Sequence, residues 1–212
     1  MKDIKLVIFD LDGTLSKTDE FSILAIQDVQ RQLGFKASSR ETIIGCYGKA
    51  FMDFMNTIFP EADEKVFKEY SKLIPKADKK YINRAVTYPG ITDMLDELIR
   101  HGYELAVCSN ANAVYINMVL KALNIDGRIK YVQELEPHMN SKGESLKNLL
   151  NKVNADKACM VGDTLFDMNA AKENNIPFIG CKYGYRPYEM EKVENTVSKV
   201  EEIPTLVHML IS

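Results

Sequence analysis

The chain has 212 residues, of which 46% are hydrophobic and 27% are charged, and its formal net charge is −3. This composition excludes a disordered or fibrous protein. The longest unbroken apolar run is four residues, whereas a membrane span needs about 20. We therefore expect a cytoplasmic protein of one or two domains, with no membrane and no nucleic acid among its partners.

The first predicted element is a strand over residues 5–10, an apolar run that ends in an aspartate. A helical segment follows it, over residues 17–86. Apolar residues at helical spacing predict one helix that ends at Gly34, a second that ends before Pro60 and a third that ends before Pro75. Five lysines recur at helical spacing between residues 65 and 79, and we interpret them as a solvated face: Lys65, Lys68, Lys72, Lys76 and Lys79.

The remaining segments alternate between strands and helices. Further strands are predicted at 103–110, 129–133, 158–163 and 177–181, and helical patterns separate them. Such continuous apolar runs are typical of parallel strands that are covered on both faces. The predicted fold class is therefore α/β, a doubly wound parallel-sheet (Rossmann-like) core over residues 1–16 and 87–212. Residues 17–86 are predicted to form a helical cap domain inserted after the first strand, in the right place for a lid over the site.

Polar residues follow the predicted strands. Asp10 and Asp12 follow the first strand, Ser109 and Asn110 the second, and Asp163 and Asp167 the fourth. The carboxyl ends of parallel strands meet at one edge of the sheet, so these groups and Lys142 are expected to form one site. Clustered carboxylates repel each other unless a cation lies between them, and all-oxygen ligands favour Mg²⁺.

This set of groups fits phosphoryl transfer. The Asp10 carboxylate can attack phosphorus and form an aspartyl-phosphate. Asp12 can protonate the leaving oxygen and then activate water. Ser109, Asn110 and Lys142 can hold phosphate oxygens through hydroxyl, amide and ammonium donors.

The same residues resemble the four motifs of the haloacid dehalogenase superfamily. These are residues 10–15 (DLDGTL), Ser109–Asn110, Lys142 and 162–167 (GDTLFD), and residues 88–90 (YPG) are also typical of that family. Relatives with this layout include phosphoglycolate phosphatases, pyrophosphatases, nucleotidases and β-phosphoglucomutases. One departure is Gly143, because many relatives have Lys-Pro where this chain has Lys142-Gly143.

The resemblance implies a role for each matched position. Asp10 is expected to be the nucleophile and a Mg²⁺ ligand, and Asp12 the general acid and base with its backbone carbonyl on the metal. Asp163 is expected to bind the metal directly and Asp167 to support it, while Lys142 steadies Asp10 and the phosphate charge. Tyr47 and Lys49, in a loop that resembles the specificity loop of the cap, are candidates for reading the leaving group.

A Mg²⁺-dependent phosphatase of a small phosphorylated metabolite is thus the predicted function. The substrate types that stay open are phosphoglycolate, a sugar phosphate, a nucleotide and pyrophosphate, and the protein is expected to be a monomer or a homodimer. A phosphomutase is the main alternative, but mutases of the family often carry Val or Ile at the position of Thr14 and a cap histidine, and residues 17–86 contain no histidine. Asp12 argues against a dehalogenase, and the complete motif set argues against a non-catalytic phosphate-binding module.

Overall fold

A computed structural model describes residues 3–49, 51–136 and 138–212. The chain forms two compact units. One combines Met1–Ser16 with Thr87–Ser212, and the other is Lys17–Val86. We refer to them as the core unit and the helical unit.

The core unit contains a six-stranded sheet in the order β3-β2-β1-β4-β5-β6, in which all neighbours are parallel. Its strands are β1 (Lys5–Phe9), β2 (Glu104–Cys108), β3 (Tyr131–Gln133), β4 (Lys157–Gly162), β5 (Phe178–Cys181) and β6 (Thr196–Val197). The strand order reverses between β1 and β4, so the sheet is doubly wound, as predicted. In such sheets ligands bind beyond the carboxyl ends of the strands at the reversal point.

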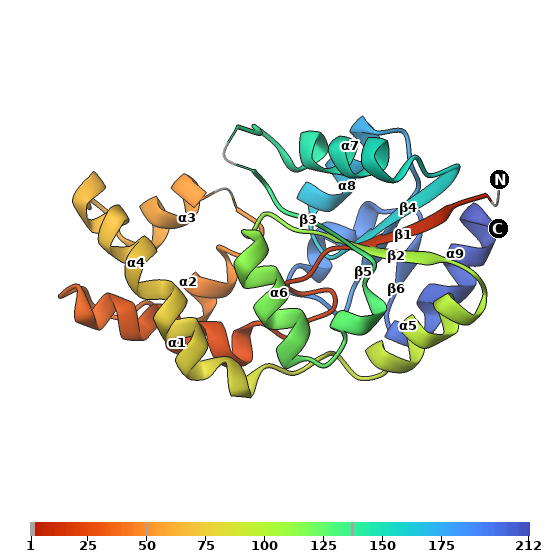
Figure 1. Ribbon diagram of the computed structural model, residues 1–212. Coiled ribbons are helices and arrows are strands. Elements are labelled where there is room, and N and C mark those ends of the chain that lie inside the picture. Colours follow the sequence, from red (N-terminus) through yellow and green to blue (C-terminus); the bar gives the residue numbers. More distant parts are fainter. Residues whose placement is uncertain (1–2, 50, 137) are drawn as a thin grey trace. The chain divides into compact units, whose positions relative to one another are not determined.

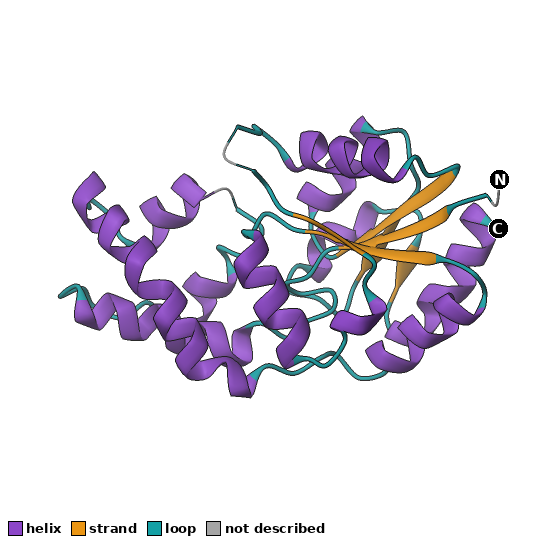
Figure 2. Ribbon diagram, in the orientation of Figure 1, coloured by secondary structure: helices purple, strands orange, loops and turns teal. Residues whose placement is uncertain are grey.

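Helices cover both faces of this sheet (Figures 1 and 2). On one face lie α7 (Lys142–Val153) and α8 (Leu165–Glu173), and on the other lie α5 (Ile91–Arg100) and α9 (Ile203–Ile211). Between β2 and β3 the chain forms α6 (Ala113–Ala122). Because each central strand is covered on both sides, β1 is apolar from Leu6 to Phe9, and all four of these residues are fully buried.

The register of the central strands fixes where their polar ends emerge. Phe9 of β1 lies between Val107 of β2 and Val161 of β4. Asp10 continues the pairing, because its backbone N–H donates to the carbonyl of Val161 over 2.8 Å. Residues just beyond these strand ends are thereby brought to the same edge of the sheet.

The helical unit contains α1 (Asp19–Gln32), α2 (Arg40–Ile44), α3 (Phe51–Ile58) and α4 (Glu64–Tyr81). An aromatic group stabilises its interior: the Phe59 ring lies 5.1 Å from that of Phe35 and 5.2 Å from that of Tyr70, both edge-on. The helix ends before Gly34 and Pro60 are confirmed, since α1 ends at Gln32 and α3 at Ile58.

The predicted helix end before Pro75 is wrong, because α4 continues through this proline to Tyr81. Proline cannot donate the helical hydrogen bond and usually breaks or kinks a helix. Here the helix is buried on both sides of Pro75, at Tyr70 before it and at Ala77 and Asp78 after it, and α4 packs along α1. In the half of α4 that follows Pro75, Lys80 and Tyr81 both donate to Asp28 of α1, and such contacts offset the lost bond.

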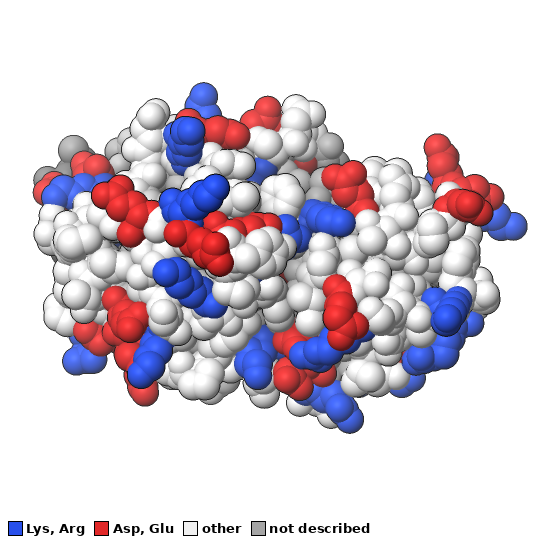
Figure 3. All heavy atoms as spheres, turned by 180° about the vertical axis from the view of Figure 1, so that it is seen from behind, with Lys and Arg blue, Asp and Glu red and all other residues white. Residues whose placement is uncertain are grey.

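The five lysines of the predicted solvated face all lie on α4 and are exposed, in agreement with that prediction. Two of them pair with acidic neighbours on the same helix, Lys68 with Glu64 and Lys72 with Glu69. On the face of the molecule in Figure 3, basic and acidic side chains are interspersed. Among the described residues, none of the helices has the length and apolar character needed to cross a membrane.

Candidate active site

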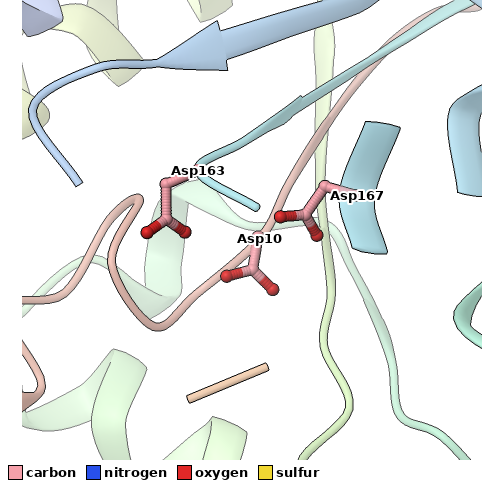
Figure 4. Close-up of side chains that lie close together, drawn as sticks. All are labelled: Asp10, Asp163 and Asp167. Atoms are coloured by element: carbon pink, nitrogen blue, oxygen red, sulfur yellow. The ribbon is translucent and has the colours of Figure 1, made fainter. Parts of the chain in front are cut away.

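Three aspartates meet at the carboxyl ends of β1 and β4. Asp10 follows β1, Asp163 follows β4, and Asp167 lies in the first turn of α8. Each offers one carboxylate oxygen, and these oxygens all lie within 4.8 Å of one another (Figure 4). Asp10 is only 7% exposed, and Asp163 and Asp167 are fully buried. The structure thus brings together three of the residues that the motifs singled out.

Lys142, at the start of α7, lies between two of these aspartates. Its ammonium pairs with the carboxylate of Asp10 and lies 2.5 Å from Oδ1 of Asp167. The other oxygen of Asp167 accepts from the backbone N–H of Thr164 over 3.1 Å and from its hydroxyl over 2.8 Å. Asp167 therefore caps α8 and orients Lys142 at the same time.

Burial and mutual repulsion dominate the electrostatics of the cluster. Burial raises the pKa of Asp10 to about 7, because Lys142 only partly offsets it and the charges of Asp167 and Asp12 add to it. The pKa of Asp163 is raised by burial and by the charges of Asp10 and Asp167. Burial also acts to lower the pKa of Lys142, but Asp10 and Asp167 outweigh it and the net shift is upward. The cluster therefore has more buried negative charge than one ammonium balances.

The carboxylate of Asp163 is held by the loop after β5 and by the turn after β1. Its Oδ2 accepts from the backbone N–H of Tyr185 over 2.8 Å, and its Oδ1 is 3.4 Å from the hydroxyl of Thr14. Two glycines make room for it. Gly13 has φ +98°, which favours glycine, and a Cβ at Gly13 or Gly184 would overlap the Asp163 side chain.

We expect Gly184→Ala to lower the free energy of unfolding by about 1–3 kcal/mol, the usual cost of overpacking, and to lower activity by displacing Asp163. Gly127→Ala is the matched control, because a Cβ at Gly127 meets no atom within 4 Å. Urea unfolding and turnover of both variants test this. Equal stability and activity of the two variants would show that Gly184 is not needed for space around Asp163.

The carboxylate of Asp12 does not belong to the three-aspartate cluster. Its Oδ1 accepts a hydrogen bond from the hydroxyl of Tyr115 in α6 over 3.0 Å. Its charge nevertheless adds to the raised pKa of Asp10. Sequence reasoning missed Tyr115, and its position soon after the Ser109–Asn110 strand end is the signal that points to this edge of the sheet.

Ser109 and Asn110 follow β2, the strand beside β1. Ser109 is buried. Its backbone N–H donates to the carbonyl of Gln133, and its hydroxyl accepts from the backbone N–H of Ala111 over 3.2 Å. The N-cap of α6 is Asn112. Helix capping therefore does not account for Ser109 and Asn110, which lie at the site edge of the sheet.

The two candidate specificity residues belong to the helical unit. Tyr47 is buried, and its hydroxyl lies 2.5 Å from that of Ser22. Lys49 is half-buried as a residue, and its ammonium lies 3.4 Å from the hydroxyl of Thr57 in an exposed contact. The contacts of Tyr47 and Lys49 described here are thus to residues of their own unit.

Gly143, where the chain departs from the family pattern, lies beside the end of α8. A Cβ at this position would overlap the carboxylate of Glu173, the last residue of α8. The carbonyl of Gly143 also accepts from the side-chain amide of Asn174 over 2.9 Å. The Glu173 carboxylate is the end of an exposed, flexible side chain that can turn aside, so sterics do not require glycine here. Lys142 keeps its place beside Asp10.

Comparison with known proteins agrees with this geometry. Residues 7–181 match the family model described as haloacid dehalogenase-like hydrolase. Phosphoglycolate phosphatase of Agrobacterium fabrum is 26% identical, covering 91% of this chain and 86% of the relative. Pyrophosphatase PpaX of Listeria monocytogenes is 30% identical, covering 80% of this chain and 79% of the relative.

A solved structure from Haemophilus somnus, described as a predicted phosphoglycolate phosphatase, has the same fold. Its TM-score is 0.87 at 22% identity, over 97% of this chain and 99% of that chain. The family model covers most of the sequence, including both strand ends that carry the buried aspartates. The protein therefore belongs to the haloacid dehalogenase-like hydrolases.

Proposed function

We propose that the protein is a Mg²⁺-dependent phosphatase of a small phosphorylated metabolite that works through an aspartyl-phosphate on Asp10. The observation that carries this proposal is the group of three buried carboxylates, those of Asp10, Asp163 and Asp167, with the buried ammonium of Lys142 between two of them. Names of the relatives, phosphoglycolate phosphatase and pyrophosphatase, support phosphate esters or anhydrides as the substrate class.

The donor set fits a hard divalent cation. The oxygens of Asp10, Asp163 and Asp167 all lie within 4.8 Å of one another, and carboxylates are the ligands that Mg²⁺ prefers. Two like charges about 4 Å apart repel by roughly 4 kcal/mol at an effective dielectric constant of 20, a cost that a cation removes. When bound, Mg²⁺ would supply charge neutralisation for the phosphoryl group. Asp10 and Asp163 would hold it, with Asp167 in support and the backbone carbonyl of Asp12 as the further predicted ligand.

Two proton transfers accompany the two displacements. The Asp10 carboxylate attacks phosphorus, the bond to the leaving oxygen breaks, and Asp12 gives that oxygen a proton. Asp12 then takes a proton from water as the water oxygen attacks the aspartyl-phosphate. The bond from phosphorus to Asp10 breaks, which releases inorganic phosphate and restores the carboxylate.

The remaining predicted residues have supporting roles in this proposal. Ser109, Asn110 and Lys142 hold the phosphoryl oxygens, and Lys142 also keeps Asp10 in place through their ion pair. Tyr47 and Lys49 stay predictions for reading the leaving group. The cytoplasmic location and the choice between monomer and homodimer also stay predictions.

A panel of substrates tests the proposal directly. With Mg²⁺, we expect phosphate release from at least one of phosphoglycolate, sugar phosphates, nucleoside monophosphates and pyrophosphate, because the Asp10 and Asp12 pair acts on the phosphoryl group that all share. Product analysis of the sugar phosphates should show free sugar. Formation of an isomeric sugar phosphate would instead support the phosphomutase alternative, and no release from any compound would contradict the phosphatase.

A further inference from the structure

We propose that Tyr115 is a positioning residue that fixes the carboxyl group of Asp12, so that Oδ2 is the atom that gives and takes the proton. This inference rests on the proposed function, in which Asp12 is the general acid and base. It assigns to α6, a helix outside the family motifs quoted above, a part in the protonation of the leaving group.

The contact between the two residues is direct. The hydroxyl of Tyr115 donates to Oδ1 of Asp12 over 3.0 Å, a normal length for a hydrogen bond between two oxygens. A hydrogen bond to an ionised group is roughly twice as strong as one between neutral groups. The bond also restricts rotation of the Asp12 carboxyl group. The next residue in the turn, Gly13, has no side chain that could do so.

The first turn of α6 is itself held firmly. The side chain of Asn112 caps the helix by accepting from the backbone N–H of Tyr115 over 3.0 Å. The carboxylate of Glu134, just after β3, accepts from the N–H of Ala113 over 2.7 Å. Glu134 thus ties the start of α6 to the end of a core strand, and the Tyr115 hydroxyl presents a fixed donor.

A fixed donor at one carboxyl oxygen selects the other for the proton. With the Tyr115 hydrogen directed at Oδ1, the neutral acid carries its proton on Oδ2. In the first displacement, Oδ2–H gives that proton to the leaving oxygen as the phosphorus–oxygen bond breaks. In the second, Oδ2 accepts a proton from the attacking water, and the cycle returns Asp12 to its neutral form.

Two aryl phosphates of nearly the same shape separate this role from a structural one. Phenyl phosphate has a strongly basic leaving group that needs a proton, whereas the leaving group of p-nitrophenyl phosphate is weakly basic and departs without one. For Tyr115→Phe we expect kcat/KM to fall about 10-fold or more on phenyl phosphate and less than about 3-fold on p-nitrophenyl phosphate. Asp12→Asn should show the same pattern with larger losses, up to about 10⁴-fold.

Tyr131→Phe is the matched control. It removes a hydroxyl from the same unit that also donates to a carboxylate, that of Glu104 over 2.8 Å, and it should leave both substrates unchanged. Melting temperatures of all variants report whether folding is intact. Equal losses on the two substrates for Tyr115→Phe, or none on either, would overturn the role of Tyr115. The proposed phosphatase function would still stand in that case if the wild type turns over both compounds and Asp12→Asn shows the expected pattern. No wild-type turnover of either compound with Mg²⁺ would overturn both.

Discussion

Replacing Asp10 with asparagine is expected to lower kcat by about a thousand-fold or more, because it removes the covalent nucleophile and nothing else in the cluster can take its place. The amide has nearly the same shape as the carboxyl group, so no cavity forms. Phosphate release with Mg²⁺, compared with wild type on the best substrate of the panel, measures the loss. Asp126→Asn, an exposed aspartate on a surface turn, is the control and should keep full activity.

The same substitution should not lower the stability of the metal-free protein at pH 8. Folding raises the pKa of Asp10 from 3.8 to about 7, so the protonated carboxyl group favours the folded state. This contribution to stability is fully present below pH 3.8, the pKa in the unfolded chain, and is lost as the pH rises through 7. At pH 8 the buried, ionised carboxylate carries a desolvation cost that the neutral amide of asparagine does not have. A large drop in melting temperature at pH 8 for Asp10→Asn would contradict this account of the buried charge.

Removal of divalent metal is expected to abolish activity, and Mg²⁺ should restore it. Ca²⁺ should restore it weakly or not at all, because Ca²⁺ accepts extra oxygen ligands and can bind both oxygens of Asp10. A readout independent of turnover is the melting temperature. Mg²⁺ at 100 times its dissociation constant should stabilise the fold by about 2.7 kcal/mol.

Asp163→Asn serves as the control for that measurement. Asp163 is fully buried in the cluster, and its loss should greatly weaken the thermal shift caused by Mg²⁺. Full activity in EDTA, with no thermal shift in Mg²⁺, would remove the metal from the proposal. It would also leave the close approach of Asp10, Asp163 and Asp167 without a function.

The strands could be predicted from the sequence wherever the apolar runs were continuous. β1, β2 and β4 are buried on both faces and therefore read as continuous apolar runs. β6 was not predicted, because its two residues are too few to show any period. The end of α4 was misplaced because the local rule for proline was outweighed by packing of the following residues against α1, which only the folded unit reveals.

For the candidate site, the charged residues could be predicted from the sequence, but the groups that hydrogen-bond to them could not. Strand ends and motif spacing are local signals, so Asp10, Asp163 and Lys142 could be named in advance. Tyr115 and the backbone N–H of Tyr185 could not be assigned, because their contacts with Asp12 and Asp163 span about 100 and 20 residues of the chain. The burial of Asp10 against Lys142 is likewise a property of the folded chain that no local pattern indicates.

The most direct test of the central claim is to trap the phosphorylated enzyme. Wild-type protein is mixed with substrate and Mg²⁺, quenched within one turnover and treated with borohydride, which reduces an aspartyl-phosphate to homoserine. Mass spectrometry of the peptides should then find homoserine at position 10 and aspartate at positions 12, 163 and 167. Homoserine at another position, or unmodified Asp10 in an enzyme that is turning over, would contradict Asp10 as the nucleophile.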